Sequence, residues 1–293
     1  MKKLLNILVL VIVSISANAQ IAGLRNDIEK LVIDKQLKIG VALLDLSNND
    51  SLFINSDDKF PMQSVYKLPI ALCVLHQVDE GKLKLTDTIR FAKADLYEHI
   101  WSPIQKANLS DCANLLLSEV INYTIQQSDN SGCDKLIEIA GGTENINNYI
   151  HSLGVTQINI LNNELEIQSD WNIQYNNWIT PQAAITLMEQ ISSGKLLSVE
   201  SQDFLWASML GTATGSIRKY LPSDIDVAYK TGFSGQNSEG LTAANNNIGI
   251  MLSPNGRKVA YAIFITDSYE SKDVNYEVIA QIGKLIANFV ATK

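Results

Sequence analysis

The chain ends in three strand-like runs: VAYKT at 227–231, AANNNIGIML at 243–252 and AYAIFIT at 260–266. They are rich in Ile, Val, Ala and Tyr, residue types that suit a pleated, buried surface. The segment after them, Asp273–Val290, has a helical pattern of apolar residues. The C-terminal part therefore predicts three strands followed by a closing helix.

A matching pattern stands near the start of the chain. Apolar residues recur at helical spacing over Ile21–Lys35, and Ile39–Leu46 is a strongly apolar strand candidate. A turn at Asn48-Asn49-Asp50 leads into a second strand, Leu52–Asn55. Strands at both ends of the chain predict one sheet that both ends build.

The middle of the chain has a mostly helical pattern. Helices are expected over Ser64–Glu80, Leu115–Gln127, Cys133–Ala140, Glu144–Leu153 (with Thr143 as its N-cap) and Pro181–Ser193. Residues 162–180 lack clear periodicity and predict a long loop of the kind that is often functional.

The expected fold is therefore α/β, an α+β sandwich. An antiparallel sheet flanked by helices comes from residues 20–62 and 205–293, and an all-helical lobe over 63–204 is inserted between its early and late strands. A helical domain followed by a separate β domain is the competing layout.

The first residues have the pattern of an export signal. Lys2 and Lys3 precede an apolar stretch, Leu4–Ser16, and Ala17-Asn18-Ala19 is an A-x-A cleavage site. Residues 1–19 are therefore expected to be a cleaved signal peptide that leads to the periplasm, with no membrane attachment afterwards. An uncleaved membrane anchor is the alternative.

Charge and cysteine content limit the partners. The formal charge is -8 with no long Lys/Arg run, which argues against nucleic acid and means that an anionic ligand needs a locally cationic pocket. Three cysteines, Cys73, Cys112 and Cys133, are interpreted as small buried side chains, and one disulfide among them stays open. None has a partner at metal-ligand spacing, so we expect no metal and no cofactor.

Three short motifs carry the chemistry. In Ser64-Val65-Tyr66-Lys67, positions i and i+3 of a helix share a face, so the amine can meet the hydroxyl and take its proton. Ser128-Asp129-Asn130 follows a helical segment directly, as a turn does. Lys230-Thr231-Gly232 ends a strand, where glycine lets a ligand approach the backbone and lysine supplies positive charge. Taken alone, each motif is better explained without function: the first as a capping serine with a solvated lysine, the second as a polar turn and the third as an edge-strand lysine.

Together, in this order and spacing, the motifs resemble the serine penicillin-recognising enzymes and, among them, the class A β-lactamases. Trp101-Ser102-Pro103, Glu164-Leu165-Glu166-Ile167 in the long loop, and Thr214-Gly215 with Arg218 extend the resemblance over essentially the whole mature chain. The family places its active site in the cleft between the two lobes.

The resemblance implies a role for each of these residues. Ser64 attacks the lactam carbonyl, Lys67 and Glu164 share the proton work of acylation, and Ser128 relays a proton to the leaving nitrogen. Glu164 then activates the water that hydrolyses the ester. Asn130 and Lys230 are implied to fix the cleft geometry, and the N–H groups of Ser64 and Phe233 to bind the oxyanion. Arg218, Lys230 and Thr231 are implied to bind the substrate carboxylate. Gly232 allows close approach of the substrate, Trp101 stands at the mouth of the cleft, and Gln168 helps to hold the water.

Several positions depart from the family pattern. Phe233 stands where many members have a small or hydroxylated residue, so one hydrogen bond to substrate is missing. Asn162 stands where many members have an arginine that braces the loop. The brace is therefore expected from Trp171, Tyr175 and Trp178, with core packing as their plain alternative. Glu164 is preferred over Glu166 as the catalytic glutamate. Glu166 is interpreted as a solvated loop carboxylate.

Other functions are weighed against this one. A D-alanyl-D-alanine carboxypeptidase or transpeptidase shares the motifs but lacks the deacylating glutamate, so the Glu164 loop separates the two. A non-catalytic β-lactam sensor domain should carry a membrane span linked to a signalling region. His76, His99 and His151 offer neither a Ser-His-Asp triad nor a metal cluster. We expect a monomer that acts on small β-lactams, with a preference for cephalosporins.

Overall fold

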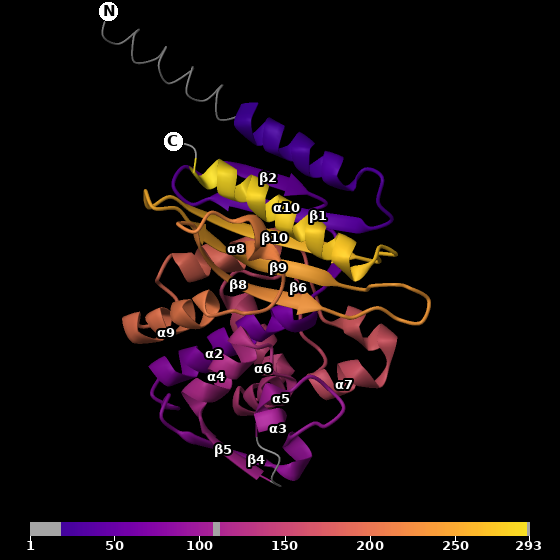
Figure 1. Ribbon diagram of the computed structural model, residues 1–293. Helices are drawn as coiled ribbons and strands as arrows, with labels where there is room; N and C mark the ends of the chain where they lie inside the picture. The colour runs from indigo at the N-terminus through magenta and orange to yellow at the C-terminus, as the bar shows by residue number, and fades with distance from the viewer. Residues whose placement is uncertain (1–18, 108–111, 292–293) are drawn as a thin grey trace, which may run out of the picture.

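The computed structural model describes residues 19–107 and 112–291 (Figure 1). Apart from Ala19, the expected signal peptide therefore lies outside the described residues. The first described helix covers residues 19–32, close to the expected one. No described helix is long and apolar enough to cross a membrane.

A five-stranded antiparallel sheet forms the upper part of the molecule in Figure 1, with the strand order β2-β1-β10-β9-β8. Its strands are β1 (Lys38–Asp45), β2 (Ser51–Ile54), β8 (Asp226–Phe233), β9 (Asn245–Leu252) and β10 (Lys258–Thr266). Lys38 at the start of β1 pairs with Thr266 at the end of β10. The expectation of an antiparallel sheet that both ends of the chain build is confirmed.

Each face of the sheet packs against helices, because strand side chains alternate between the two faces. On β10, Tyr261 and Ile263 join the cluster that includes helix 19–32 and α10 (Lys272–Ala291). Ala262 and Phe264, which alternate with them, join the cluster around α8 (Pro181–Ser192) and the helical part. Central strands buried on both faces explain the near-continuous apolar runs in the sequence.

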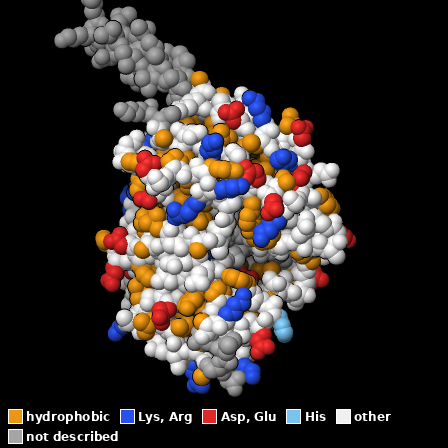
Figure 2. All heavy atoms as spheres, viewed as in Figure 1, with side chains coloured by type: hydrophobic (Ala, Val, Ile, Leu, Met, Phe, Trp, Pro, Cys, Tyr) orange, Lys and Arg blue, Asp and Glu red, His pale blue; other side chains and the backbone are white. Residues whose placement is uncertain are grey.

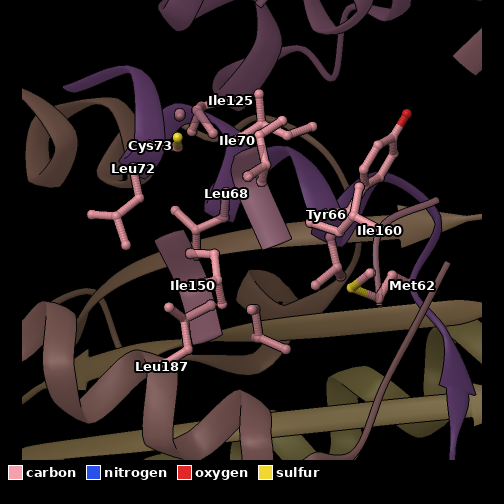
Figure 3. Packing of buried hydrophobic residues seen from close by; sticks show 14 of the residues in the cluster. Met62, Tyr66, Leu68, Ile70, Leu72, Cys73, Ile125, Ile150, Ile160 and Leu187 are labelled. Carbon is pink, nitrogen blue, oxygen red and sulfur yellow. The ribbon is translucent and has the colours of Figure 1, made fainter. Parts of the chain in front are cut away.

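Helices dominate the part of the chain between the early and late strands (Figure 1). They are η1 (Gln63–Tyr66), α2 (Lys67–Asp79), η2 (Lys93–Asp95), α3 (Pro103–Ala107), α4 (Leu117–Gln126), α5 (Asn130–Ile139), α6 (Thr143–Ser152), α7 (Glu164–Ser169), η3 (Trp171–Asn176), α9 (Val199–Leu210) and η4 (Ile217–Tyr220). The first nine residues of α2 are buried on all sides and form the centre of this core (Figure 3). The nucleophile motif therefore stands at the start of the most buried helix.

This middle part is not all-helical, contrary to the sequence-based expectation. β4 (Thr88–Ala92) pairs with β5 (Cys112–Leu116), and a small sheet contains β3 (Phe60–Pro61), β6 (Ile158–Asn159) and β7 (Trp178–Ile179). This strand pair was missed because both strands have only five residues, are mostly solvent-exposed and lie far apart in the chain.

Three local predictions are wrong. Thr143 lies inside α6, whose N-cap is Gly142 with φ +93°. The expected loop over 162–180 contains α7, η3 and β7. Cys112 is exposed, whereas Cys73 and Cys133 are buried as predicted and form no disulfide.

Candidate active site

The nucleophile candidate, Ser64, lies in the single turn of η1 that leads into α2. Gln63 before it has φ +45°, a left-handed conformation that turns the chain sharply from β3 into the helix. Gly232 on β8 lies against this turn, and a side chain there would collide with the carbonyl oxygen of Met62. The glycine therefore lets the strand and the Ser64 turn approach each other closely.

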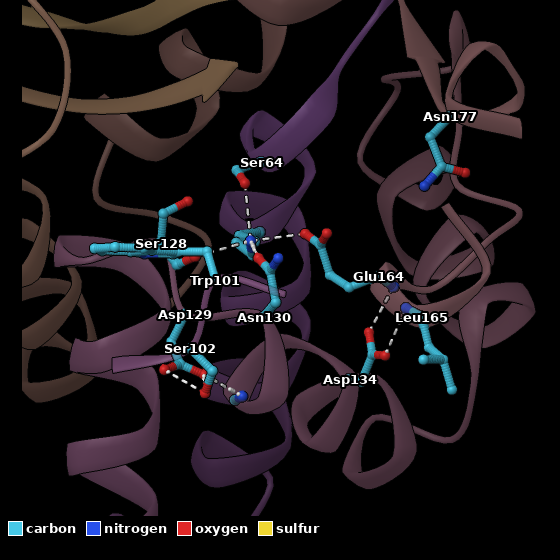
Figure 4. A network of polar contacts seen from close by, with 12 residues as sticks. Ser64, Trp101, Ser102, Ser128, Asp129, Asn130, Asp134, Glu164, Leu165 and Asn177 are labelled. Atoms are coloured by element: carbon cyan, nitrogen blue, oxygen red, sulfur yellow. Dashed lines mark hydrogen bonds and ion pairs between the residues drawn. The ribbon is translucent and has the colours of Figure 1, made fainter. Parts of the chain in front are cut away.

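Lys67 is the centre of a polar network, and its partners Ser64, Asn130 and Glu164 are labelled in Figure 4. Its Nζ is 2.8 Å from Ser64 Oγ, 2.6 Å from Asn130 Oδ1 and 3.2 Å from the carbonyl oxygen of Ser128. It also forms an ion pair with Glu164, at 2.7 Å between Nζ and Oε1. Both side chains are almost fully buried, so each charge depends on the other for compensation.

The Lys67–Glu164 contact has the separation of a hydrogen bond but not its alignment. Glu164 Oε1 has no hydrogen-bond partner among the described residues. We treat the contact as an ion pair, in which Oε1 keeps its capacity to accept a hydrogen bond.

Lys230 brings a second buried amine to the site from β8. Its Nζ donates to Ser128 Oγ and to the carbonyl oxygen of Thr231, each at 3.0 Å. Burial lowers the pKa of Lys230 well below its usual value, and the positive charge of Lys67 adds to the effect. Two buried amines thus contact the two serines: Lys67 contacts Ser64, and Lys230 contacts Ser128.

The Ser128-Asp129-Asn130 turn is held from inside. Ser128 is left-handed at φ +60°, and Asp129 is the N-cap of α5, where it accepts the N–H of Gly132. Asp129 also accepts the N–H of Ile104 and the hydroxyl of Ser102, although burial still raises its pKa. The motif's middle residue therefore ties the turn to the Trp101-Ser102-Pro103 segment.

Glu164 is the first residue of α7, and the helix N-terminus is fixed by carboxylates. Asp134 accepts the N–H of Glu164 at 2.7 Å and that of Leu165 at 3.1 Å (Figure 4). Asn163 caps the same turn by accepting the N–H of Glu166, whose own carboxylate accepts the N–H of Asn163. Glu166 is thus an exposed capping residue, whereas Glu164 points into the network.

Asparagines close the base of the Glu164 loop, and of the three aromatic residues expected to brace it Tyr175 contributes a hydrogen bond. The buried Asn177 accepts the N–H groups of Leu161 and Asn162 and donates to the carbonyl oxygen of Asn162. Tyr175 does anchor the loop, through a 2.7 Å hydrogen bond to Asp267. Within the part of the chain that the structure describes, the side chains of Trp171 and Trp178 form no hydrogen bond, and Lys59 lies over the ring of Trp178.

Most of the predicted residues line one cleft of about 490 Å³. The predicted residues along it are Ser64, Trp101, Ser128, Asn130, Glu164, Gln168, Thr231, Gly232 and Phe233. Lys67 and Lys230 reach it through their hydrogen bonds to the two serines. Sequence reasoning missed Gln63, Asn245, Lys272 and Tyr276, which also line the cleft.

Arg218 does not line this cleft. Its Nη2 donates to the carbonyl oxygens of Leu210 and Val227, and its guanidinium lies over the ring of Tyr229. The expected contact between Arg218 and the substrate carboxylate is therefore not supported, because its guanidinium joins η4 to the edge of the sheet.

No metal site accompanies the cleft: the described residues contain no group of three or more His, Cys, Asp or Glu side chains that could hold an ion. On the face shown in Figure 2, acidic and basic side chains are interspersed and no single-sign surface stands out. The chemistry on offer is that of a serine hydroxyl beside two amines and a carboxylate. This combination suits acyl transfer through a serine ester.

Comparison with known proteins agrees with that class. The sequence profile of the β-lactamase enzyme family matches residues 23–290. β-Lactamase VEB-1 of Pseudomonas aeruginosa is 39% identical over 294 residues, which cover 99% of this chain and 98% of that protein. The extended-spectrum β-lactamase PER-1 of the same organism is 38% identical over 282 residues, 96% and 91% of the two chains.

Solved structures agree as well. The crystal structure of TLA-3 extended-spectrum β-lactamase matches with a TM-score of 0.90 at 40% identity, over 92% of this chain and 99% of that chain. The chain therefore belongs to the β-lactamase enzyme family. It is a class A serine β-lactamase, a hydrolase of β-lactams that gives antibiotic resistance.

Proposed function

We propose that this enzyme opens the β-lactam amide through an ester on Ser64, which a water activated by Glu164 then hydrolyses. The observation that carries the proposal is the chain of contacts Ser64–Lys67–Glu164, with 2.8 Å and 2.7 Å between the polar atoms. The Ser64 hydroxyl can pass its proton to Lys67, and the Glu164 carboxylate lies beside the same amine.

Acylation begins when Ser64 Oγ attacks the lactam carbonyl carbon. Its proton passes to the Lys67–Glu164 pair, and the carbonyl oxygen takes the negative charge beside the N–H groups of Ser64 and Phe233. Ser128 delivers a proton to the lactam nitrogen as the C–N bond breaks. The 3.0 Å contact between Lys230 Nζ and Ser128 Oγ supports this relay, because the amine can replace the hydroxyl's proton. The proton that Ser64 gave to the Lys67–Glu164 pair then returns to Lys230, so that Glu164 is again a carboxylate before deacylation.

Deacylation depends on Glu164. Glu164 lines the cleft and its buried Oε1 keeps acceptor capacity, so the carboxylate can take a proton from a water that attacks the ester. Gln168 lies one turn further along α7, also at the cleft, and helps to hold that water.

Substrate binding falls to the rest of the cleft. Thr231 and Thr214 bring their hydroxyls within 2.5 Å of each other beside the buried Lys230 amine, a suitable site for the ring carboxylate. Asn130 and Trp101 contact the acyl substituent, with Phe233 on the opposite wall. Cephalosporins are the expected preferred substrates. The lobe division at 20–62, 63–204 and 205–293, a monomeric state and export to the periplasm after loss of residues 1–19 complete the proposal.

The test uses two neighbouring glutamates as a matched pair. Glu164→Gln removes the base but keeps the size of the side chain, and general-base work is worth about 10²–10⁴ in rate. This variant should release one product burst per enzyme from a chromogenic cephalosporin and keep a long-lived adduct on Ser64, seen by mass spectrometry. Glu166→Gln, which alters only the exposed cap, should turn over almost normally.

The opposite pattern would move the catalytic role to Glu166. Turnover that stays normal in both variants, or an adduct on a residue other than Ser64, would overturn the mechanism. A single stoichiometric burst by the unaltered enzyme would indicate a carboxypeptidase or transpeptidase instead.

A further inference from the structure

Lys272 stands at the mouth of the cleft although sequence reasoning did not single it out. It is the first residue of α10, it is exposed, and it lines the cleft together with Phe233 and Tyr276. The described part of the chain contains no ion pair that joins Lys272 to a carboxylate. In a protein with a formal charge of -8, this amine is a local positive charge facing the substrate site.

Two aromatic rings hold the amine in place. The Nζ of Lys272 is 5.4 Å from the centre of the Phe233 ring and 5.2 Å from that of Tyr276. The two rings meet edge to face, with centres 5.7 Å apart. Ring faces attract a cation without neutralising it, so the charge stays available to a ligand.

The position of Phe233 along β8 relates Lys272 to the ring carboxylate. Thr231 and Phe233 are two residues apart on one strand, so their side chains share a face and lie about 7 Å apart. A substrate carboxylate beside Thr231 therefore has Phe233 and Lys272 as its next neighbours along the cleft. Arg218, whose guanidinium binds two backbone carbonyls elsewhere, does not compete for this place.

We propose that Lys272, held over Phe233 and Tyr276, binds a second anionic group on the substrate. The preferred ligand is a β-lactam with a negatively charged substituent on the ring carbon next to the one that carries the carboxylate, an arrangement that the cephalosporin ring allows. The inference rests on the proposed function, because it takes the ring carboxylate to lie beside Lys230 and Thr231. Lys272 is then a specificity-determining residue and takes no part in bond breaking.

The experiment compares three cephalosporins that differ only in that substituent, which is a carboxylate, an amide or a quaternary ammonium group. Lys272→Met keeps the alkyl chain over the rings and removes the charge. An exposed ion pair corresponds to a change of up to about fivefold in kcat/KM. We expect this loss for the carboxylate compound, less than a twofold change for the amide, and a gain for the ammonium compound. The difference should shrink at about 0.5 M salt, where exposed charges are screened.

Two further variants sharpen the comparison. Lys272→Glu should reverse the preference in favour of the ammonium compound. Lys195→Met, an exposed lysine outside the cleft, removes the same net charge and should leave the order of the three substrates unchanged.

The outcomes separate this inference from the proposed function. Equal losses on all three substrates would assign Lys272 to the packing of Phe233 and overturn the inference, as would unchanged values. Both results leave turnover by the unaltered enzyme intact. If the unaltered enzyme turns over none of the three compounds, the proposed function fails and the subsite fails with it.

Discussion

Asp134, which holds the backbone of Glu164, makes stability depend on pH in a defined direction. Burial, above all, raises the pKa of Asp134 from 3.8 to about 6, against the hydrogen bonds that its carboxylate accepts from Glu164 and Leu165. The folded protein thus binds this proton more tightly than the unfolded chain does. The contribution of Asp134 to the free energy of unfolding is fully present below about pH 4 and is lost as the pH rises to about 6. Above about pH 6 this contribution no longer changes.

The size of the effect follows from the same shift. One pKa unit corresponds to about 1.4 kcal/mol, so a rise from 3.8 to about 6 amounts to roughly 3 kcal/mol across the window. Asp134→Asn keeps an acceptor oxygen for one of the two α7 N–H groups, loses the other acceptor at every pH, and has no charge to bury. Its free energy of unfolding, relative to the unaltered protein, should therefore increase between about pH 4 and pH 6.

Urea unfolding of both proteins from about pH 4 to pH 8 measures this difference. Asp224→Asn serves as the control, because Asp224 is exposed and should give a curve parallel to the unaltered protein. Parallel curves for Asp134→Asn and the unaltered protein would refute the reasoning, since they would mean that Asp134 takes up no extra proton on folding.

Two other contacts lead to predictions of a similar kind. Gln174→Leu removes the 2.6 Å hydrogen bond between the buried Gln63 and Gln174, which joins the Ser64 turn to η3. The free energy of unfolding, measured in urea, should fall by about 1–3 kcal/mol. Deacylation should slow more than acylation. An unchanged unfolding midpoint together with unchanged kinetics would show that this link is dispensable. Arg218→Ala should lower the melting temperature but leave unchanged the ratio of kcat/KM between substrates with and without the ring carboxylate. A tenfold fall in that ratio would return Arg218 to the carboxylate site.

The residues predicted best from sequence are those whose side-chain type the chemistry itself requires. A hydroxyl and an amine three residues apart must share a helical face, so the spacing of Ser64 and Lys67 was enough to pair them. The sheet could be predicted because β1 and β10 are nearly continuous apolar runs and the other strands carry shorter apolar segments.

What the sequence did not reveal depends on partners that lie far apart in the chain. Asp134 and Asn177 accept hydrogen bonds from backbone N–H groups of the Glu164 loop. Every residue type except proline has such a group, so the sequence does not indicate these partners. Arg218 had the right charge for the expected role, but the orientation of η4 turns its guanidinium toward carbonyl oxygens. Lys272 was missed because only the packing of α10 on the sheet brings it to Phe233.

The pairing of β1 with β10 also governs when this protein can fold. Lys38 is synthesised early, yet its partner Thr266 is among the last residues made. At about 5–20 residues per second, β1 waits for tens of seconds before the strand beside it exists. Until β10 is made, the sheet lacks its central strand, so neither of the two cores that pack against its faces can form.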